Sequence, residues 1–212
     1  MILTKAALAA LFLQCAPQVA PTTLETIVSV ESSGNPNVIA VVDDGSSIYP
    51  EDKASAIKFT KELERQGKNY SAGLMQVNKK NFVKYGLDIN KAYEPCNNIA
   101  TGAKIYEQCY IDAKNDKRFP DEQAALRGAL SCYYSGNMSR GFVKEGKKNE
   151  SYVDRANDAV NKIYSVPAIK PNKDTSAKDY VVAQDDIKDS TQVSTENKPK
   201  KQPWDVYGDF NL

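Results

Sequence analysis

The chain has 212 residues, enough for one domain of ordinary size and a tail. Its formal net charge is +1, so composition does not indicate nucleic acid or an anionic membrane surface as the main partner. The chain contains no histidine, which excludes zinc–histidine sites, Ser-His-Asp triads and Cys-His dyads. Acid–base chemistry near neutral pH must therefore come from a carboxylate, Lys, Tyr or Cys with a shifted pKa.

The opening residues 1–12 contain one lysine followed by a short apolar run. This segment fits either a short secretion signal, with a cut after Ala20, or a first core helix. We favour the helix because the apolar stretch is short and no run of transmembrane length follows. The sequence thus predicts no membrane span and leaves the export route open.

The four cysteines are Cys15, Cys96, Cys109 and Cys132, an even number that fits an oxidising compartment, although four buried thiols would look the same. If residues 97–111 form one helix, Cys96 and Cys109 lie roughly 20 Å apart and cannot bridge. Two disulfides would then join the other two cysteines to this pair, in either order.

Several helices are expected along the chain. A second helix should begin at Thr22, the N-cap of a capping box completed by Glu25, and end near Gly34. Residues 38–49, with an Asp-Asp-Gly turn, favour a small hairpin or loop, and residues 50–67 an amphipathic helix closed by glycine. Further helices are predicted at about 78–85, 97–111, 121–133, 138–146 and 152–164.

After Pro167 the composition becomes polar, with few residues able to form a core. We interpret residues 167–212 as a disordered tail that follows a single domain at 1–166. The tail ends in an aromatic cluster at 203–210, which contains the only tryptophan. This cluster is either a docking peptide that folds on binding or a strand or turn that packs back on the domain. The fold class is therefore mainly α, with a small hairpin or loop insertion.

Glu31 stands out on the second predicted helix. Leu24, Ile27 and Val28 mark an apolar face at positions i, i+3 and i+4, and Glu31 follows at i+7. Partial burial and the negative end of the helix dipole both raise the pKa of a carboxyl. A general acid that works near neutral pH needs this environment. The alternative is a glutamate that reaches solvent at a fraying helix end.

Other segments are ambiguous when each is taken alone. Residues 73–78, Gly-Leu-Met-Gln-Val-Asn, could line a sugar cleft through Met75 and Gln76, or be an ordinary loop. Asn98 near the start of one helix and Gly136 at the end of another are explained by helix termini. Tyr152 near the start of the last helix is explained by core packing.

Taken in order, these motifs carry a resemblance to a known family. They are Glu31-Ser32-Ser33-Gly34-Asn35-Pro36, Gly73-Leu74-Met75-Gln76-Val77-Asn78, Asn98-Ile99-x-x-Gly102, Tyr133-x-x-Gly136 and Tyr152-Val153. The series resembles the soluble, goose-lysozyme-like lytic transglycosylases. It is most similar to the transglycosylases of conjugative type IV secretion systems, which share Cys15-Ala16-Pro17 and Ser131-Cys132-Tyr133. The resemblance covers Leu11 to Tyr164.

The resemblance implies an α+β lysozyme-like fold with Glu31 as the catalytic acid and base. It further implies a substrate cleft lined by Gln76, Asn98 and Tyr133, with Tyr152 near the glutamate and with Ser33 and Met75 as secondary contacts. The chain departs from the family at Tyr134, where an asparagine is common.

The implied reaction cleaves the β-1,4 bond from N-acetylmuramic acid to N-acetylglucosamine in peptidoglycan and forms a 1,6-anhydro product. No metal or cofactor is required. The implied setting is the periplasm, where the enzyme opens the wall locally for a secretion apparatus whose components bind its tail. Two alternatives stay open: a hydrolytic goose-type lysozyme in which Asp43 or Asp44 positions water, and a wall-binding scaffold without turnover.

Overall fold

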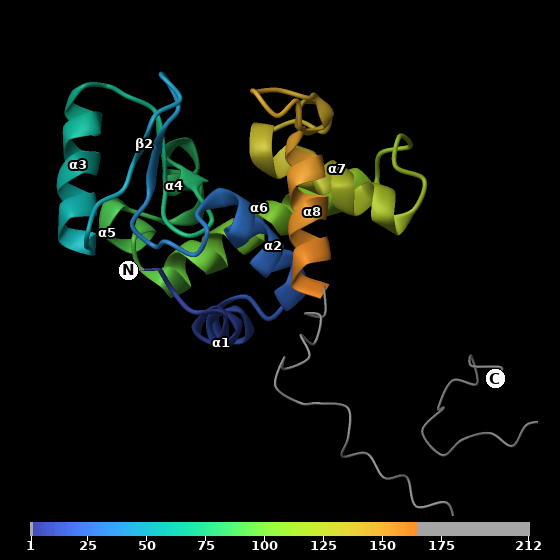
Figure 1. Ribbon diagram of the computed structural model, residues 1–212, viewed down its shortest axis with the longest axis horizontal. Helices are drawn as coiled ribbons and strands as arrows, with labels where there is room; N and C mark the ends of the chain where they lie inside the picture. The colour runs from blue at the N-terminus through green and yellow to red at the C-terminus, as the bar shows by residue number, and fades with distance from the viewer. Residues whose placement is uncertain (1, 165–212) are drawn as a thin grey trace, which may run out of the picture. The chain divides into compact units, whose positions relative to one another are not determined.

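The computed structural model describes residues 2–164, which form a mainly helical domain with one small sheet (Figure 1). The helices are α1 (Lys5–Cys15), α2 (Pro21–Glu31), α3 (Lys53–Arg65), α4 (Phe82–Tyr85), α5 (Ile89–Ala92), α6 (Pro95–Lys114), α7 (Glu122–Ser135) and α8 (Tyr152–Tyr164). Two 3-10 turns accompany them, η1 (Lys79–Asn81) and η2 (Arg140–Phe142). The predicted fold class is confirmed. The predicted tail at 167–212 lies outside the described residues and stays a prediction.

The sheet has the strand order β2-β1-β3-β4, with every neighbouring pair antiparallel. Its strands are β1 (Ile39–Val41), β2 (Ser47–Ile48), β3 (Tyr70–Ala72) and β4 (Val77–Asn78). β1 and β2 form the predicted hairpin around the Asp-Gly turn. The strands β3 and β4 were not predicted, because two or three residues are too few to show an alternating pattern. The segment 73–78, expected as a loop, is thus the turn between β3 and β4 followed by β4 itself.

α6 is the central helix of the domain, and it packs against α1, α5 and α7 (Figure 1). Its buried face carries Ile99, Ala103 and Tyr106. On one side of it lie the sheet and α3, and on the other side α7 and α8. α2 packs against both α1 and α8, so the end of α2 is held between the two sides of the molecule.

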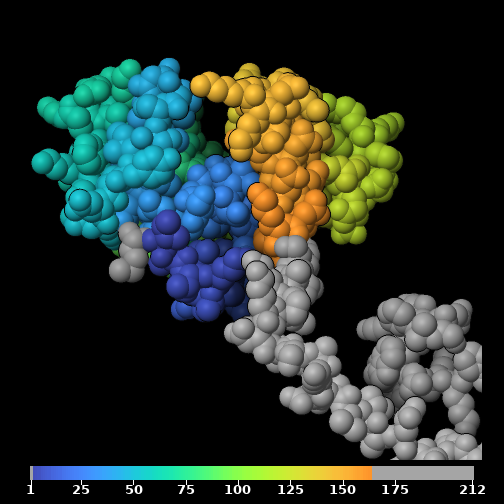
Figure 2. Space-filling view, in the orientation of Figure 1, coloured from blue at the N-terminus to red at the C-terminus, as the bar shows by residue number. Residues whose placement is uncertain are grey.

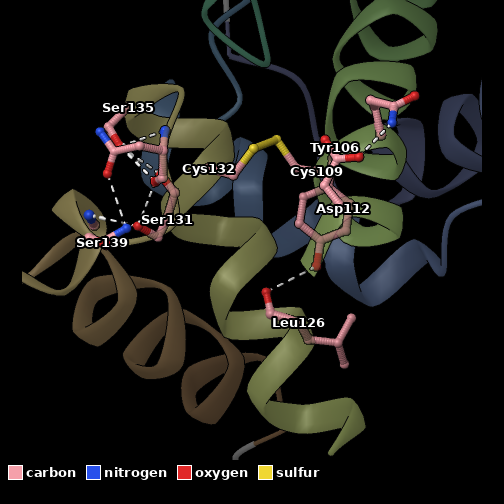
Figure 3. The surroundings of a disulfide bond; sticks show 11 residues. Tyr106, Cys109, Asp112, Leu126, Ser131, Cys132, Ser135 and Ser139 are labelled. Atoms are coloured by element: carbon pink, nitrogen blue, oxygen red, sulfur yellow. Dashed lines mark hydrogen bonds between the residues drawn. A yellow bond between two sulfur atoms is a disulfide. The ribbon is translucent and has the colours of Figure 1, made fainter. Parts of the chain in front are cut away.

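Two disulfides join α6 to its neighbours: Cys15–Cys96 ties α1 to the start of α6, and Cys109–Cys132 ties α6 to α7 (Figure 3). This pairing is one of the two orders that the sequence left open. The helix expected in the opening residues is also present, with Leu8 and Phe12 in the core. Within residues 2–164, none of the helices is both long and apolar enough to span a bilayer.

Three predicted helix starts or extents are wrong. α2 begins at Pro21 after Ala20, so the capping box at Thr22 does not form, because proline is favoured at the first helical position. α6 begins at Pro95 for the same reason, which places Asn98 inside the helix. The helix expected at 138–146 is only the turn η2, since Gly141 packs against Ser131, where an added Cβ would lie 2.5 Å from the Ser131 Cα.

Candidate active site

A pocket of about 890 Å³ separates the sheet side of the domain from the end of α7 and the residues that follow it. Figure 2 shows it as a hollow between the light-blue β1–β2 segment and the gold segment before α8. Glu31 lines this pocket together with residues of β1, β3 and β4, of the α4 region, of the second half of α6 and of the end of α7. A polymer could therefore lie across Glu31 and contact both sides of the domain.

Glu31 is the last residue of α2, and the apolar stripe of that helix determines where its side chain points. Leu24, Ile27 and Val28 are at most 1% exposed, so the face that they share with Glu31 is held against the core. The chain then turns through Ser33 and Gly34, with φ angles of 53° and 80°. The carboxyl is consequently kept at the pocket wall, and the residue as a whole is only partly exposed.

Tyr152, the first residue of α8, is buried beside Glu31, and its hydroxyl donates a hydrogen bond of 2.6 Å to Glu31 Oε1. Burial raises the pKa of Glu31 from 4.5 to about 7. The Tyr152 bond and the charge of Arg155 oppose this shift, because both stabilise the carboxylate. The sequence-based expectation of a raised pKa is thus confirmed, with burial as its main cause.

The ring of Tyr152 is held by its neighbours. Tyr134 stacks on it with 4.6 Å between ring centroids, and the Arg155 guanidinium lies 5.4 Å from the Tyr152 centroid. The Tyr134 hydroxyl donates to Glu145, which also pairs with Arg140 at 3.2 Å. Tyr134, the residue at which the chain departs from the resembled family, therefore packs on the residue that hydrogen-bonds Glu31.

Gln76 lines the pocket with a fixed side-chain amide. Its Nε2 donates to the carbonyl oxygens of Val38, at 3.0 Å, and Gly73, at 2.8 Å. Because these bonds use the amide N–H groups, the orientation of the amide is determined and Oε1 faces the other way. This oxygen is buried and has no partner within the described part of the chain. Gln76 thus offers a free acceptor, which a sugar hydroxyl or acetamido N–H could fill.

Asn98 is buried in α6 and does not line the pocket, contrary to the predicted cleft contact. Its amide donates to the carbonyl oxygens of Ala72 and Ala92, both at 2.9 Å, and its Oδ1 accepts from the Met75 N–H at 2.7 Å. Gly73 leaves room for this amide, since a Cβ there would lie 2.4 Å from Asn98 Nδ2. Asn98 therefore holds the turn that carries Gln76.

The other predicted site residues lie at different depths. Tyr133 lines the pocket, and its hydroxyl donates to the Met75 carbonyl oxygen at 2.5 Å. The Met75 side chain is fully buried against Gly102. Ser33 is exposed away from the pocket, and its hydroxyl donates to the Ser29 carbonyl oxygen at 3.4 Å. The structure thus brings Glu31, Gln76 and Tyr133 to one pocket, places Tyr152 behind Glu31, and separates Ser33 from them.

Asp43 and Asp44, the predicted water-positioning residues of the hydrolytic alternative, are exposed on the β1–β2 turn and do not line the pocket. Each accepts a backbone N–H, Asp43 from Asn69 and Asp44 from Ser46. The pocket lining has one other acid, Asp112 on α6, which accepts a hydrogen bond of 2.9 Å from Gln108 and lies near the Cys109–Cys132 bond (Figure 3).

Several residues of the pocket were not predicted from the sequence, among them Asn69, Lys80 and Lys84. The two lysines carried a signal, because they stand four positions apart in the predicted helix 78–85 and so share one face. Asn69 carried none, because its position depends on a backbone hydrogen bond from Val42, a residue distant in sequence.

Comparison with known proteins places this site in a family. The family model described as Transglycosylase SLT domain matches residues 10–156. Type IV secretion system protein virB1 of Brucella abortus is 42% identical over 168 residues, 77% of this chain and 70% of the relative, and that of Brucella suis has the same identity and coverage. Protein virB1 of Agrobacterium fabrum is 26% identical over 197 residues, 93% of this chain and 69% of the relative. No solved structure matches the chain. The chain therefore belongs to the SLT transglycosylase family and is a peptidoglycan lytic transglycosylase.

Proposed function

We propose that the chain cleaves the β-1,4 bond from N-acetylmuramic acid to N-acetylglucosamine and forms a 1,6-anhydro product, with Glu31 as the acid and then the base. The observation that carries this proposal is one carboxyl at the pocket wall, with a pKa near 7 and a buried hydroxyl donor on its oxygen. A carboxyl with this pKa stays protonated up to near neutral pH, so it can act as the acid of the first step, which itself produces the carboxylate needed in the second.

In the first step, protonated Glu31 gives its proton to the glycosidic oxygen as the bond from that oxygen to the C1 of the muramic acid breaks. The carboxylate left behind accepts the Tyr152 hydroxyl bond and lies within the field of Arg155. In the second step, it takes the proton of the C6 hydroxyl while the O6 bonds to C1. The anhydro ring closes, Glu31 is protonated again, and no water is consumed.

The substrate is held by the fixed groups around Glu31. The free Oε1 of Gln76 accepts from a sugar hydroxyl or an acetamido N–H, and the ring of Tyr133 provides apolar contact. Asn98 and Met75 act behind the surface, because the Asn98 amide and the Met75 backbone hold the turn between β3 and β4. We assign no substrate contact to Ser33, which lies outside the pocket.

We further propose that this activity opens the wall locally, in the periplasm, for a type IV secretion apparatus. This proposal is supported by the Brucella relatives, which are named as type IV secretion system proteins. Binding of secretion components through residues 167–212 stays a prediction from the sequence.

Mass spectrometry of fragments released from purified peptidoglycan tests the reaction. Anhydro-muramic ends, lighter by one water than reducing ends, are expected. Reducing-end muramic acid would instead show hydrolysis, the alternative for which a second carboxylate positions water. Release of no fragments by the unaltered chain, with retained binding to the wall, would favour the scaffold alternative.

A further inference from the structure

The pocket extends along the sheet well beyond Gln76. The Val38 carbonyl oxygen accepts from the Gln76 side chain, and four residues later the Val42 N–H donates to the Asn69 carbonyl oxygen at 2.9 Å. Four residues of extended chain span about 13 Å. Val42 and Asn69, which both line the pocket, thus lie more than one sugar ring away from the point where the Gln76 side chain bonds to Val38.

Asn69 presents an unused acceptor at this far end. Its backbone N–H donates to Asp43 and its carbonyl oxygen accepts from Val42, so the main chain is fully bonded. Its side-chain Oδ1 is buried and lacks a hydrogen-bond partner within residues 2–164. Buried polar atoms are rarely left without a partner, and an orphaned acceptor at a pocket wall is satisfied when a ligand supplies an N–H or O–H.

Two positive charges lie on this side of the pocket, because η1, which carries the first of them, packs against β3, the strand that begins directly after Asn69. Lys80 and Lys84 stand four residues apart across η1 and α4, and both line the pocket with Tyr85. Neither ammonium group has an ion-pair partner within the described range, whereas Arg140, the other cation of the lining, is paired with Glu145. The Lys84 Nζ lies 5.1 Å from the Tyr85 ring centroid. The two lysines therefore make this part of the pocket locally cationic, although the chain as a whole is nearly neutral.

We infer that Val42, Asn69, Lys80, Lys84 and Tyr85 form a distal subsite for a sugar unit that carries an anionic peptide stem. A stem peptide offers amide N–H groups for Asn69 Oδ1 and carboxylates for the two lysines, while Val42 and Tyr85 contact its apolar parts. A glycan strand without peptides keeps only the lactyl carboxylate beside each muramic acid ring, and it offers neither stem amide N–H groups nor a carboxylate remote from the ring. This inference rests on the proposed function, and it predicts a preference for peptide-bearing strands.

The test compares a double substitution, Lys80→Gln with Lys84→Gln, against the matched double substitution Lys58→Gln with Lys61→Gln. Lys58 and Lys61 are exposed on α3 outside the pocket, so the control changes the net charge equally. The kcat/KM is measured on peptide-bearing strands and on the same strands after enzymatic removal of the peptides. The Lys80/Lys84 variant should lose roughly three- to tenfold on peptide-bearing strands only, and the loss should shrink at high salt.

Substitution of Asn69→Ala should likewise lower kcat/KM on peptide-bearing strands by roughly two- to tenfold, as expected for one lost hydrogen bond. Equal loss on both substrates, or no more loss than the Lys58/Lys61 control shows, would overturn the distal subsite. Binding of the two kinds of strand to the Glu31→Gln chain separates this outcome from failure of the proposed reaction, because it needs no turnover. The Kd for strands without peptides divided by the Kd for peptide-bearing strands reports the distal subsite. This ratio should approach one when Lys80 and Lys84 are also substituted.

Discussion

Replacing Tyr152 with phenylalanine should raise the pKa of Glu31 above its value of about 7. The substitution keeps the ring that stacks on Tyr134 and removes only the hydroxyl that donates to Glu31 at 2.6 Å. A hydrogen bond to a charged group is stronger than one to a neutral group by about 1 kcal/mol. That difference corresponds to about 0.7 pKa unit in favour of protonated Glu31.

The assay is the pH profile of kcat/KM for fragment release from purified peptidoglycan. Activity requires protonated Glu31 in the free enzyme, so it falls as pH rises through the pKa, and this alkaline limb should move to higher pH in Tyr152→Phe. The rate at lower pH should also fall, because the carboxylate formed in the first step loses its donor.

Tyr70→Phe is the matched control, since it removes a buried hydroxyl that donates to Glu64 at 2.9 Å and that does not line the pocket. Its pH profile should be unchanged. A Tyr152→Phe limb that stays in place or moves to lower pH would refute the reasoning about Glu31.

Glu31→Gln should leave the free energy of unfolding unchanged near pH 4.5 and raise it by about 1–2 kcal/mol above pH 7, less than the full shift because the residue is partly exposed. The pKa of Glu31 is about 7 in the folded chain and 4.5 in the unfolded chain, so the unaltered chain loses stability as the pH rises between these values. Denaturant titration measures this difference. A Glu31→Gln chain destabilised by several kcal/mol would identify Glu31 as structural. Gly102→Ala should lower the free energy of unfolding by about 1–3 kcal/mol and reduce activity, because the new Cβ would lie 2.6 Å from Met75 Sδ. An unchanged Tm would contradict that packing. Deletion of residues 167–212 should leave the cleavage of purified wall nearly unchanged, and a loss of activity would contradict the reading of this segment as a tail.

Glu31 and some of the elements of the fold could be predicted from the sequence, because local sequence patterns determine them. The stripe of Leu24, Ile27 and Val28 identified Glu31 because helix geometry places i+7 on the same face. The Asp-Gly turn predicted the β1–β2 hairpin, and α8 has the expected bounds. The bond from Tyr152 to Glu31 joins residues 121 positions apart, and only the family resemblance placed the two together.

The role of Asn98 could not be predicted, because it depends on tertiary contacts. Its amide bonds to groups of Ala72, Met75 and Ala92, the first from the end of β3, the second from the turn between β3 and β4 and the third from the end of α5. Asparagine in a sequence motif is equally compatible with a substrate contact, a helix cap and this internal bracing. The orphaned acceptor of Asn69 was hidden for a related reason, since burial without a partner is a property of the folded chain.

The most direct test of the account is to compare wall cleavage by the unaltered chain and by Glu31→Gln, at equal concentration and with folding of both verified. The unaltered chain should release soluble muropeptides from purified peptidoglycan, and Glu31→Gln should release none while it still binds the strands. Release of fragments by Glu31→Gln at a rate near that of the unaltered chain would contradict the claim that one carboxyl serves as both acid and base.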